Sequence, residues 1–281
     1  MKLGVFMFTA HYAMDLPALG IAAEERGFES LWVPEHTHIP SSRATPFPYK
    51  PELPDEYSHP LDPYVALAAV AAVTKTLRLG TGISLIIQRD PITLAKSVAS
   101  LDHISRGRVD FGIGGGWNRE EMANHGTDYT RRWKLMRERT EAMKAIWTQE
   151  RATYHGEFVN FDEIWSWPKP LQKPHPPILV AGNGARTLQR VARYGDGWLP
   201  LPHGLDTFVD KLKALEDLCA AAGRPMVPVS LFYAPTSKPA KMAQFRDEGV
   251  SRVVWSVPSA GRDVVLPKLD ELVRQREQIG E

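Results

Sequence analysis

Hydrophobic residues in this chain form short continuous runs, which alternate with longer stretches in which apolar positions recur every three or four residues. The short runs are typical of buried parallel strands, and the spaced positions, such as Leu16, Leu19 and Ala23, are typical of amphipathic helices. The runs predict strands over 3–8, 29–34, 77–83, 108–113, 178–181, 197–201, 227–233 and 251–257. The spaced stretches predict helices over 15–26, 63–73, 92–104, 130–148, 185–194, 206–222, 239–247 and 263–278.

This alternation predicts the fold class. An open, doubly wound sheet can contain the same pattern, but eight strand–helix units are what a closed (β/α)₈ barrel requires. The chain has 281 residues, and such barrels typically take about 250. No internal boundary is visible, so we predict one α/β domain over 1–281. It is a (β/α)₈ TIM barrel with insertions after the second strand and before the fifth.

The two insertions differ in character. Residues 37–62 are rich in proline, and a segment of this length in a compact domain is usually functional or disordered. Because it follows the second strand, we predict that it is a substrate lid at the mouth of the barrel. The second insertion, over 152–177, predicts a β-hairpin around 154–158. Its proline-rich return carries Trp165 and Trp167, which with Tyr49 and Tyr57 indicate an apolar pocket or simply pack on the barrel.

Composition excludes several classes of protein. Lys and Arg number 34 against 33 Asp and Glu, so no basic surface favours nucleic acid. The single cysteine, Cys219, lies on an apolar helical stripe and excludes an internal disulfide; we expect it to be buried. No run approaches the roughly 18 apolar residues of a membrane span, and no cationic leader precedes the first strand. We therefore expect a cytoplasmic protein that binds no nucleic acid and no membrane.

Candidate catalytic residues stand where the second predicted strand ends, in Glu35, His36 and His38. In a (β/α)₈ barrel the carboxyl ends of all strands meet at one mouth, and polar residues there usually perform chemistry. Histidine titrates near neutrality, so we predict that His36 is a general acid or base, or a donor to a cofactor ring, with Glu35 as a second candidate. A His-x-His metal pair is the alternative, but later strand ends offer no further ligands, so we predict no metal.

A glycine-rich turn follows the fourth strand, over 111–121. It is not a dinucleotide fingerprint, because Trp117 stands where the third Gly or Ala belongs. A tight turn explains one glycine but not Gly114, Gly115 and Gly116 together; without β-carbons they let a planar ring lie against the backbone. We predict that Asn118 caps the next helix, with Glu121 completing a capping box.

A second glycine turn, in Ala181, Gly182, Asn183, Gly184 and Ala185, joins a strand to a helix. The first amides of a helix are unpaired and favour anions, and Arg186 adds a counter-charge. We predict that a cofactor phosphate binds here. Gly82 and Ile83, at the end of the third strand, are candidates for a strained backbone at the mouth.

Together these motifs resemble the bacterial luciferase-like superfamily of flavin and deazaflavin barrels. The resemblance covers essentially the whole chain and rests on LWVPEH at 31–36, LRLGTG at 77–82, GRVDFGIG at 107–114, GWN at 116–118 and GDGW at 195–198. Within the superfamily the chain is most similar to the actinobacterial branch that uses coenzyme F420, an 8-hydroxy-5-deazaflavin.

The resemblance implies roles for individual positions. His36 matches a histidine that faces the reactive ring carbon, and Gly82-Ile83 matches a non-prolyl cis peptide behind the ring. Gly114 to Gly116 match the segment beside the ring, where Trp117 and Asn118 follow, and Gly182 to Ala185 match the phosphate grip. Sugar-phosphate dehydrogenases of this family carry a glutamate just after the fourth strand, where this chain has Trp117-Asn118. A sugar-phosphate substrate is therefore disfavoured.

The resemblance implies an F420-dependent oxidoreductase that transfers a hydride between the deazaflavin and a small organic substrate. One alternative is an FMN-dependent, oxygen-activating monooxygenase of the alkanesulfonate type on the same barrel, and a remote one is a non-catalytic flavin-binding protein. Because the family often dimerises through barrel helices, the Ala- and Val-rich helix over 63–73 is a candidate homodimer face; ordinary barrel packing also explains its composition.

Overall fold

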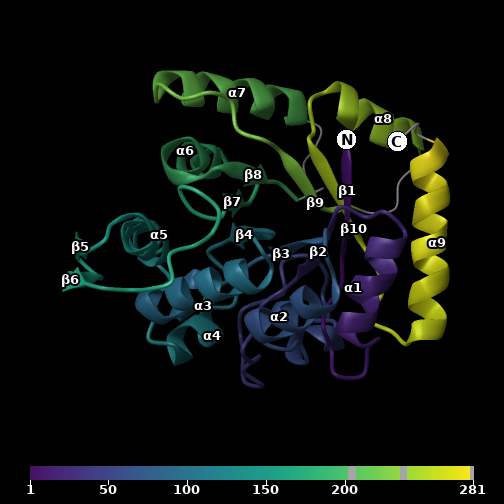
Figure 1. The fold of residues 1–281 in the computed structure, drawn as a ribbon, viewed down its shortest axis with the longest axis horizontal. Helices are drawn as coiled ribbons and strands as arrows, with labels where there is room; N and C mark the ends of the chain where they lie inside the picture. The colour runs from purple at the N-terminus through teal and green to yellow at the C-terminus, as the bar shows by residue number, and fades with distance from the viewer. Residues whose placement is uncertain (202–206, 235–238, 279–281) are drawn as a thin grey trace.

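The strands of the computed structural model, which describes residues 1–201, 207–234 and 239–278, form a parallel eight-stranded barrel with helices around it (Figure 1). Neighbouring strands follow the order β8-β7-β4-β3-β2-β1-β10-β9. The amide of Trp198 donates to the carbonyl of Pro228 (3.0 Å), and that of Phe232 to the carbonyl of Pro200 (2.8 Å), which joins β8 to β9. The predicted TIM barrel is confirmed. Its strands are β1 Lys2–Phe6, β2 Ser30–Val33, β3 Arg78–Thr81, β4 Val109–Ile113, β7 Ile178–Ala181, β8 Gly197–Leu199, β9 Ser230–Ala234 and β10 Arg252–Ser256.

The helices begin at clear sequence signals. Asp15, Asp62 and Asp90 cap α1, α2 and α3 through their carboxylates, each with a proline in the first turn. The helices are α1 Leu16–Glu25, α2 Pro63–Val73, α3 Pro91–Ile104, α4 Arg119–Asn124, α5 Arg132–Thr148, α6 Ala185–Tyr194, α7 Phe208–Ala221, α8 Pro239–Asp247 and α9 Arg262–Gln278, with short 3₁₀ turns η1 Asp55–Ser58 and η2 Ile86–Gln88. The predicted start at 206 lies outside the described residues. None of the helices described here is long and apolar enough to cross a membrane.

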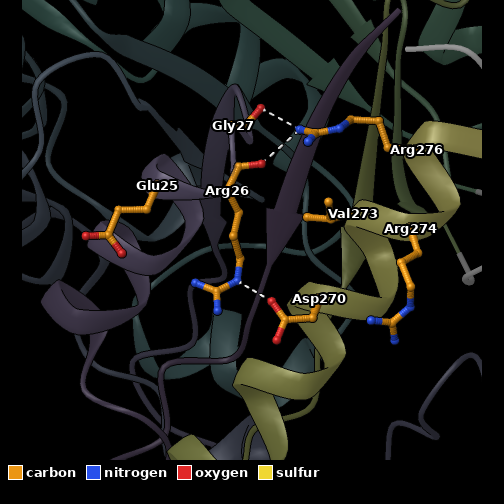
Figure 2. Close-up of a pocket in the computed structure, with 7 residues that line it drawn as sticks. All are labelled: Glu25, Arg26, Gly27, Asp270, Val273, Arg274 and Arg276. Carbon is orange, nitrogen blue, oxygen red and sulfur yellow. Dashed lines mark hydrogen bonds and ion pairs between the residues drawn. The ribbon is translucent and has the colours of Figure 1, made fainter.

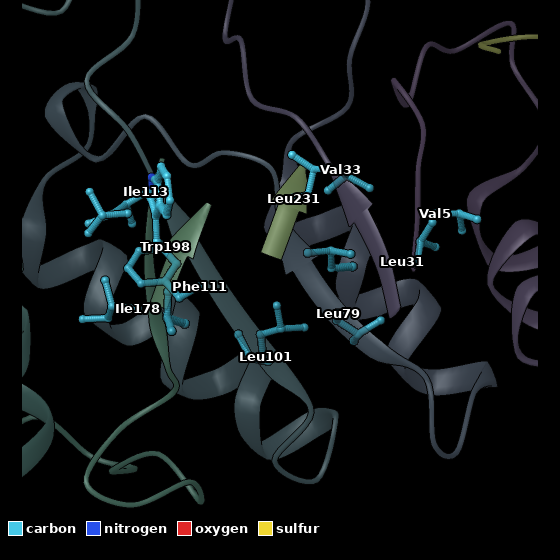
Figure 3. Close-up of a cluster of buried hydrophobic side chains, with 14 of the residues drawn as sticks. Val5, Leu31, Val33, Leu79, Leu101, Phe111, Ile113, Ile178, Trp198 and Leu231 are labelled. Atoms are coloured by element: carbon cyan, nitrogen blue, oxygen red, sulfur yellow. The ribbon is translucent and has the colours of Figure 1, made fainter. Parts of the chain in front are cut away.

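Side chains alternate between two apolar layers along each strand, as the pleat requires. Outward-facing residues such as Val5, Leu31 and Phe111 pack against the helices in the layer shown in Figure 3. Inward-facing residues form a second, smaller cluster inside the barrel, made of Phe6, Phe8, Trp32, Leu179, Leu199, Phe232 and Val254. Cys219 is buried, as expected.

Ion pairs close the amino-terminal end of the barrel interior. Asp110 lies 2.6 Å from Arg78 and 3.0 Å from Arg252, and Arg252 also pairs with Glu29 at 2.7 Å. Directly above, the buried ring of Trp32 fills the space beside Gly80, where a β-carbon would lie 2.2 Å from the indole. Among the described residues the barrel is therefore plugged at this end, and a ligand would enter from the carboxyl ends of the strands.

The predicted insertion before the fifth barrel strand is a hairpin, confirmed as β5 Ala152–His155 paired with β6 Asn160–Ile164. Figure 1 shows it beside α5, outside the barrel. Trp165 and Trp167, which follow it, are 69% and 58% exposed and line no part of the site below. The interpretation of these two tryptophans as pocket residues is wrong, because the hairpin carries them away from the mouth.

A hollow at the opposite end of the barrel lies between α1 and the C-terminal helix α9 (Figure 2). Arg26 pairs with Asp270 at 2.7 Å, and Arg276 donates to the carbonyls of Arg26 and Gly27 at 2.9 and 3.0 Å. These contacts join the last helix to the first. Because α1 ends here and leads into the start of β2, the hollow lies away from the mouth.

Candidate active site

A cavity of about 400 Å³ opens at the carboxyl ends of the barrel strands. Its floor is the inner apolar cluster, since Phe6, Phe8 and Phe232 belong to both. Most of the predicted site residues meet in its wall: Glu35, His36, Gly82, Ile83, Gly114, Gly115, Gly116, Trp117, Ala181 and Gly182. These residues come from four separate parts of the chain, each of which follows the carboxyl end of a barrel strand or lies at that end.

The glycine segment after β4 allows close packing in the wall. A β-carbon at Gly114 would lie 2.0 Å from Cδ1 of Ile83, and one at Gly115 would lie 2.4 Å from the Trp133 ring. The glycines thus admit neighbouring side chains as well as a planar ligand. The Gly82–Ile83 peptide bond is cis, as the resemblance implies.

His36 is oriented by Glu121, a residue of the first turn of α4. Nδ1 of His36 lies 2.8 Å from Oε2 of Glu121, and the two side chains are 8% and 1% exposed. An ionised carboxylate only accepts hydrogen bonds, so Nδ1 carries the proton and Nε2 is the nitrogen left for a ligand. His36 can accept or donate a proton at Nε2 without losing its orientation.

The capping-box prediction for Glu121 is wrong, although half of that motif is present. The side chain of Asn118 accepts from the amides of Glu120 and Glu121, both at 3.1 Å, so Asn118 is the predicted N-cap. The Glu121 carboxylate does not accept a hydrogen bond from the Asn118 amide, because it binds His36 instead. Asn118 is fully buried beneath α4 and does not line the cavity.

Glu35 reaches the cavity wall but is held in a polar network. Its Oε2 accepts from the Ser84 hydroxyl at 2.9 Å and from the Leu85 amide at 2.7 Å, while Oε1 pairs with Arg89. Arg89 also binds Asp62, the cap of α2. This arrangement fixes the segment after the cis peptide and leaves neither Glu35 oxygen without a partner.

The predicted phosphate grip lies beside the cavity. Ala181 and Gly182 line it, whereas Asn183, Gly184 and Ala185 lie beyond its wall. Asn183 accepts from the amide of Leu201 at 2.8 Å and donates to its carbonyl at 2.9 Å, which ties the ends of β7 and β8 together. Gly184 caps α6 without a side chain, so the first α6 amides are available to an anion.

Several residues that line the cavity were not predicted from the sequence. Phe6 ends β1 and Phe8 follows it, Phe232 and Tyr233 come from β9, and Trp133 comes from α5. Alternation within 3–8 places Phe6 and Phe8 on one face of their strand, a signal that could have found them. Nothing local distinguishes Trp133 from an ordinary helix residue.

The segment 37–62 covers the cavity, in keeping with the predicted lid. Phe47, Tyr49 and Tyr57 line the cavity, and Phe47 and Tyr57 contact each other with ring centroids 4.8 Å apart. Glu120 of α4 holds the segment by accepting from the amides of Ala44 and Thr45 at 2.9 and 3.1 Å. Burial raises the pKa of Tyr57 far above 10, so its phenol stays a neutral hydrogen-bond donor.

The neighbouring His38 turns away from the cavity. It contacts Thr37 at 2.9 Å and Asn124 at 2.9 Å, and Thr37 also contacts His125 at 2.7 Å. These residues tie the start of the lid to the end of α4. Within the described ranges, no group of three or more His, Cys, Asp or Glu side chains is placed to hold a metal ion.

The sequence matches the model of the luciferase-like monooxygenase family over residues 1–252, and the chain belongs to that family. An uncharacterized protein of Mycobacterium tuberculosis, Rv0953c, is 43% identical over 267 residues, 94% of each chain. The F420-dependent hydroxymycolic acid dehydrogenase of the same organism is 31% identical over 200 residues, 70% of this chain and 51% of that protein. The structure of an F420-dependent secondary alcohol dehydrogenase in complex with an F420–acetone adduct superposes with a TM-score of 0.80 at 17% identity, covering 99% and 98% of the two chains.

Proposed function

We propose that this protein is an F420-dependent oxidoreductase that transfers a hydride between the deazaflavin and a small organic substrate. The observation that carries the proposal is the buried His36–Glu121 pair in the wall of an aromatic cavity at the barrel mouth. The 31% identity to an F420-dependent dehydrogenase supports the same cofactor.

The cavity suits a planar heterocycle. Its volume of about 400 Å³ lies within the usual range for small-molecule sites, and its walls are apolar or aromatic apart from a few polar groups. Gly82, Ile83 and Gly114 to Trp117 would hold the ring. Gly182 to Ala185 would hold the phosphate through backbone amides.

A bound deazaflavin supplies the hydride chemistry at a ring carbon, and the protein supplies orientation and proton transfer. When an alcohol is oxidised, Nε2 of His36 accepts the hydroxyl proton as the carbon loses its hydride. In the reverse direction Nε2 returns that proton to the carbonyl oxygen. Throughout, Glu121 accepts a hydrogen bond from Nδ1–H of His36, and its negative charge stabilises the protonated ring.

The apolar lining favours a substrate without multiple charges. Phe8, Phe47, Tyr57 and Tyr233 line the same cavity as His36, and the lid adds Lys50 and Glu56 to that lining. Burying apolar surface against these rings contributes about 25 cal/mol per Å² to binding. Small secondary alcohols, ketones and aldehydes with apolar substituents are the class to test first.

An FMN-dependent monooxygenase is the second candidate, favoured by the description of the family itself. The two functions differ in their need for oxygen. We expect the purified protein to interconvert oxidised and reduced F420 with alcohols or carbonyl compounds under anaerobic conditions. Oxygen consumption with reduced FMN, and no anaerobic turnover with F420, would favour the monooxygenase; binding without turnover of either would favour a non-catalytic flavin carrier.

A further inference from the structure

A strip of arginine and aromatic side chains extends from the cavity across α5, α4 and α6. Trp133 lines the cavity; Cζ of Arg190 lies 3.9 Å and that of Arg132 4.6 Å from the centre of its ring. Arg132 also lies 3.5 Å from the centre of the Tyr129 ring, on which Arg119 sits at 4.4 Å. We call Arg119, Tyr129, Arg132, Trp133, Arg186 and Arg190 the arginine–aromatic strip.

The arginine–aromatic strip adjoins the predicted phosphate site at Gly182 to Ala185. Arg186 lies in the first turn of α6, and Arg190 follows four residues later on the same face of that helix. A ligand that occupies the cavity and places a phosphate at the α6 amides would therefore leave the cavity beside Arg186 and Arg190.

The positive charge of the strip is not neutralised by carboxylates in the described part of the chain. None of Arg119, Arg132, Arg186 and Arg190 forms an ion pair there, and Nε of Arg132 is buried without a hydrogen-bond partner. The nearby carboxylates are engaged elsewhere: Glu120 with the lid, Glu121 with His36 and Asp128 with Thr130.

The neighbouring arginines of the strip repel one another electrostatically. Burial first, and then the charge of Arg119, lower the pKa of Arg132; burial, Arg132 and Arg186 lower that of Arg190. Guanidinium groups remain charged nevertheless, and they suit bidentate binding of phosphate and carboxylate. A cluster of like charges held on aromatic rings beside a ligand cavity is typical of a surface that binds an anion.

We infer that the arginine–aromatic strip binds an anionic tail of the cavity's ligand, a chain of carboxylates that continues beyond the first phosphate. This inference rests on the proposed function, because the oligoglutamate tail of F420 has this chemistry and FMN ends at its phosphate. The strip would then select the deazaflavin by its tail, separately from the ring.

The test measures binding and needs no turnover. The probes are F420 with an oligoglutamate tail, the form that keeps the phosphodiester but lacks glutamates, the deazaflavin riboside without phosphate, and FMN. We expect the tailed form to bind about tenfold more tightly than the glutamate-free form at low salt, with the difference shrinking as salt is added. Fluorescence titration gives each Kd.

The variant R186Q/R190Q removes two charges of the strip, and R193Q at the other end of α6 is the matched control. We expect the preference for the tailed form to fall to about twofold in the double variant and to stay unchanged in R193Q. R186Q alone, at an exposed position, repeats the test if the double variant unfolds. Equal affinity for tailed and glutamate-free forms, or an unchanged preference in the variants, would overturn the tail site alone. Binding of FMN but of no deazaflavin would overturn the proposed function and the tail site together.

Discussion

Nδ1 of His36, just after β2, lies 2.8 Å from Oε2 of Glu121, in the first turn of α4. Both side chains are almost fully buried, so the carboxylate fixes the imidazole where water cannot compete for it. This contact holds the His36 imidazole in one orientation, as the proton transfer that we propose for it requires. It also gives Glu121 a role that depends on His36 and not on helix capping.

The variant Glu121→Gln tests this positioning role. It keeps the size of the side chain but removes the charge that stabilises a protonated His36, so we expect kcat to fall about 10²- to 10⁴-fold with little change in cofactor Kd. The pH profile of kcat should change as well. E25Q, on the exposed surface of α1, is the control; a normal kcat and pH profile in E121Q would show that the pair is only structural.

Substitution of His36 distinguishes a role in proton transfer from a role in cofactor binding. His36→Ala removes the group that we propose gives or takes the proton, and such acid–base catalysis is worth about 10²–10⁴ in rate, or roughly 3–5 kcal/mol. We expect kcat to fall by that factor while cofactor Kd changes far less. If H36A loses the cofactor but keeps its rate at saturation, His36 binds the ring and Glu35, His38 or water supplies the proton.

Gly184, the cap of α6, tests the phosphate grip. A β-carbon there meets nothing within 4 Å, and φ is −77°, so larger residues fit the fold. We expect Gly184→Val to weaken cofactor binding by about tenfold, because its branched side chain occupies the approach to the amides, and Gly184→Ala to weaken it less. Circular dichroism and the cofactor-free Tm should stay near wild type. An unchanged Kd in folded G184V would place the phosphate elsewhere.

The sequence predicted those features of the site that depend on a single segment. Strand ends followed from apolar runs, and His36, Gly114 and Ala181 follow directly from where those runs stop. The His36–Glu121 contact joins residues 85 positions apart, and the local pattern at Asn118 pointed Glu121 to a different partner. Trp133 reaches the cavity only because glycine at 115 makes room for it, which a helix pattern cannot reveal.

The homodimer remains a proposal. The helix α2 buries Leu67 and Val70 against the barrel but leaves Val65 and Val73 exposed, at 73% and 45%. Barrel packing therefore explains only one face of this helix. The exposed apolar face is where we propose that a second copy of the chain docks.

His175, buried near the start of β7, sets an expectation for stability against pH. Burial lowers its pKa below the ordinary value of about 6.5. Above that pH the residue is neutral in both states and has no effect; below it, the unfolded chain takes up a proton that the folded protein excludes. Stability should fall by up to about 1.4 kcal/mol per pH unit until the folded pKa is reached.

Urea unfolding between pH 7.5 and 5 measures this contribution. We expect His175→Gln to lose less stability on acidification than wild type, whatever its stability at neutral pH. H155Q, at an exposed position in the hairpin, is the control. The same acid dependence in H175Q and wild type would show that His175 does not titrate across this range.

Comparative titration shows whether the cavity binds a deazaflavin in preference to FMN. Purified protein is titrated with F420 and with FMN under the same conditions, and each Kd is obtained from fluorescence. We expect micromolar or tighter binding of F420 and at least about tenfold weaker binding of FMN. Equal affinities, or tighter binding of FMN, would contradict it.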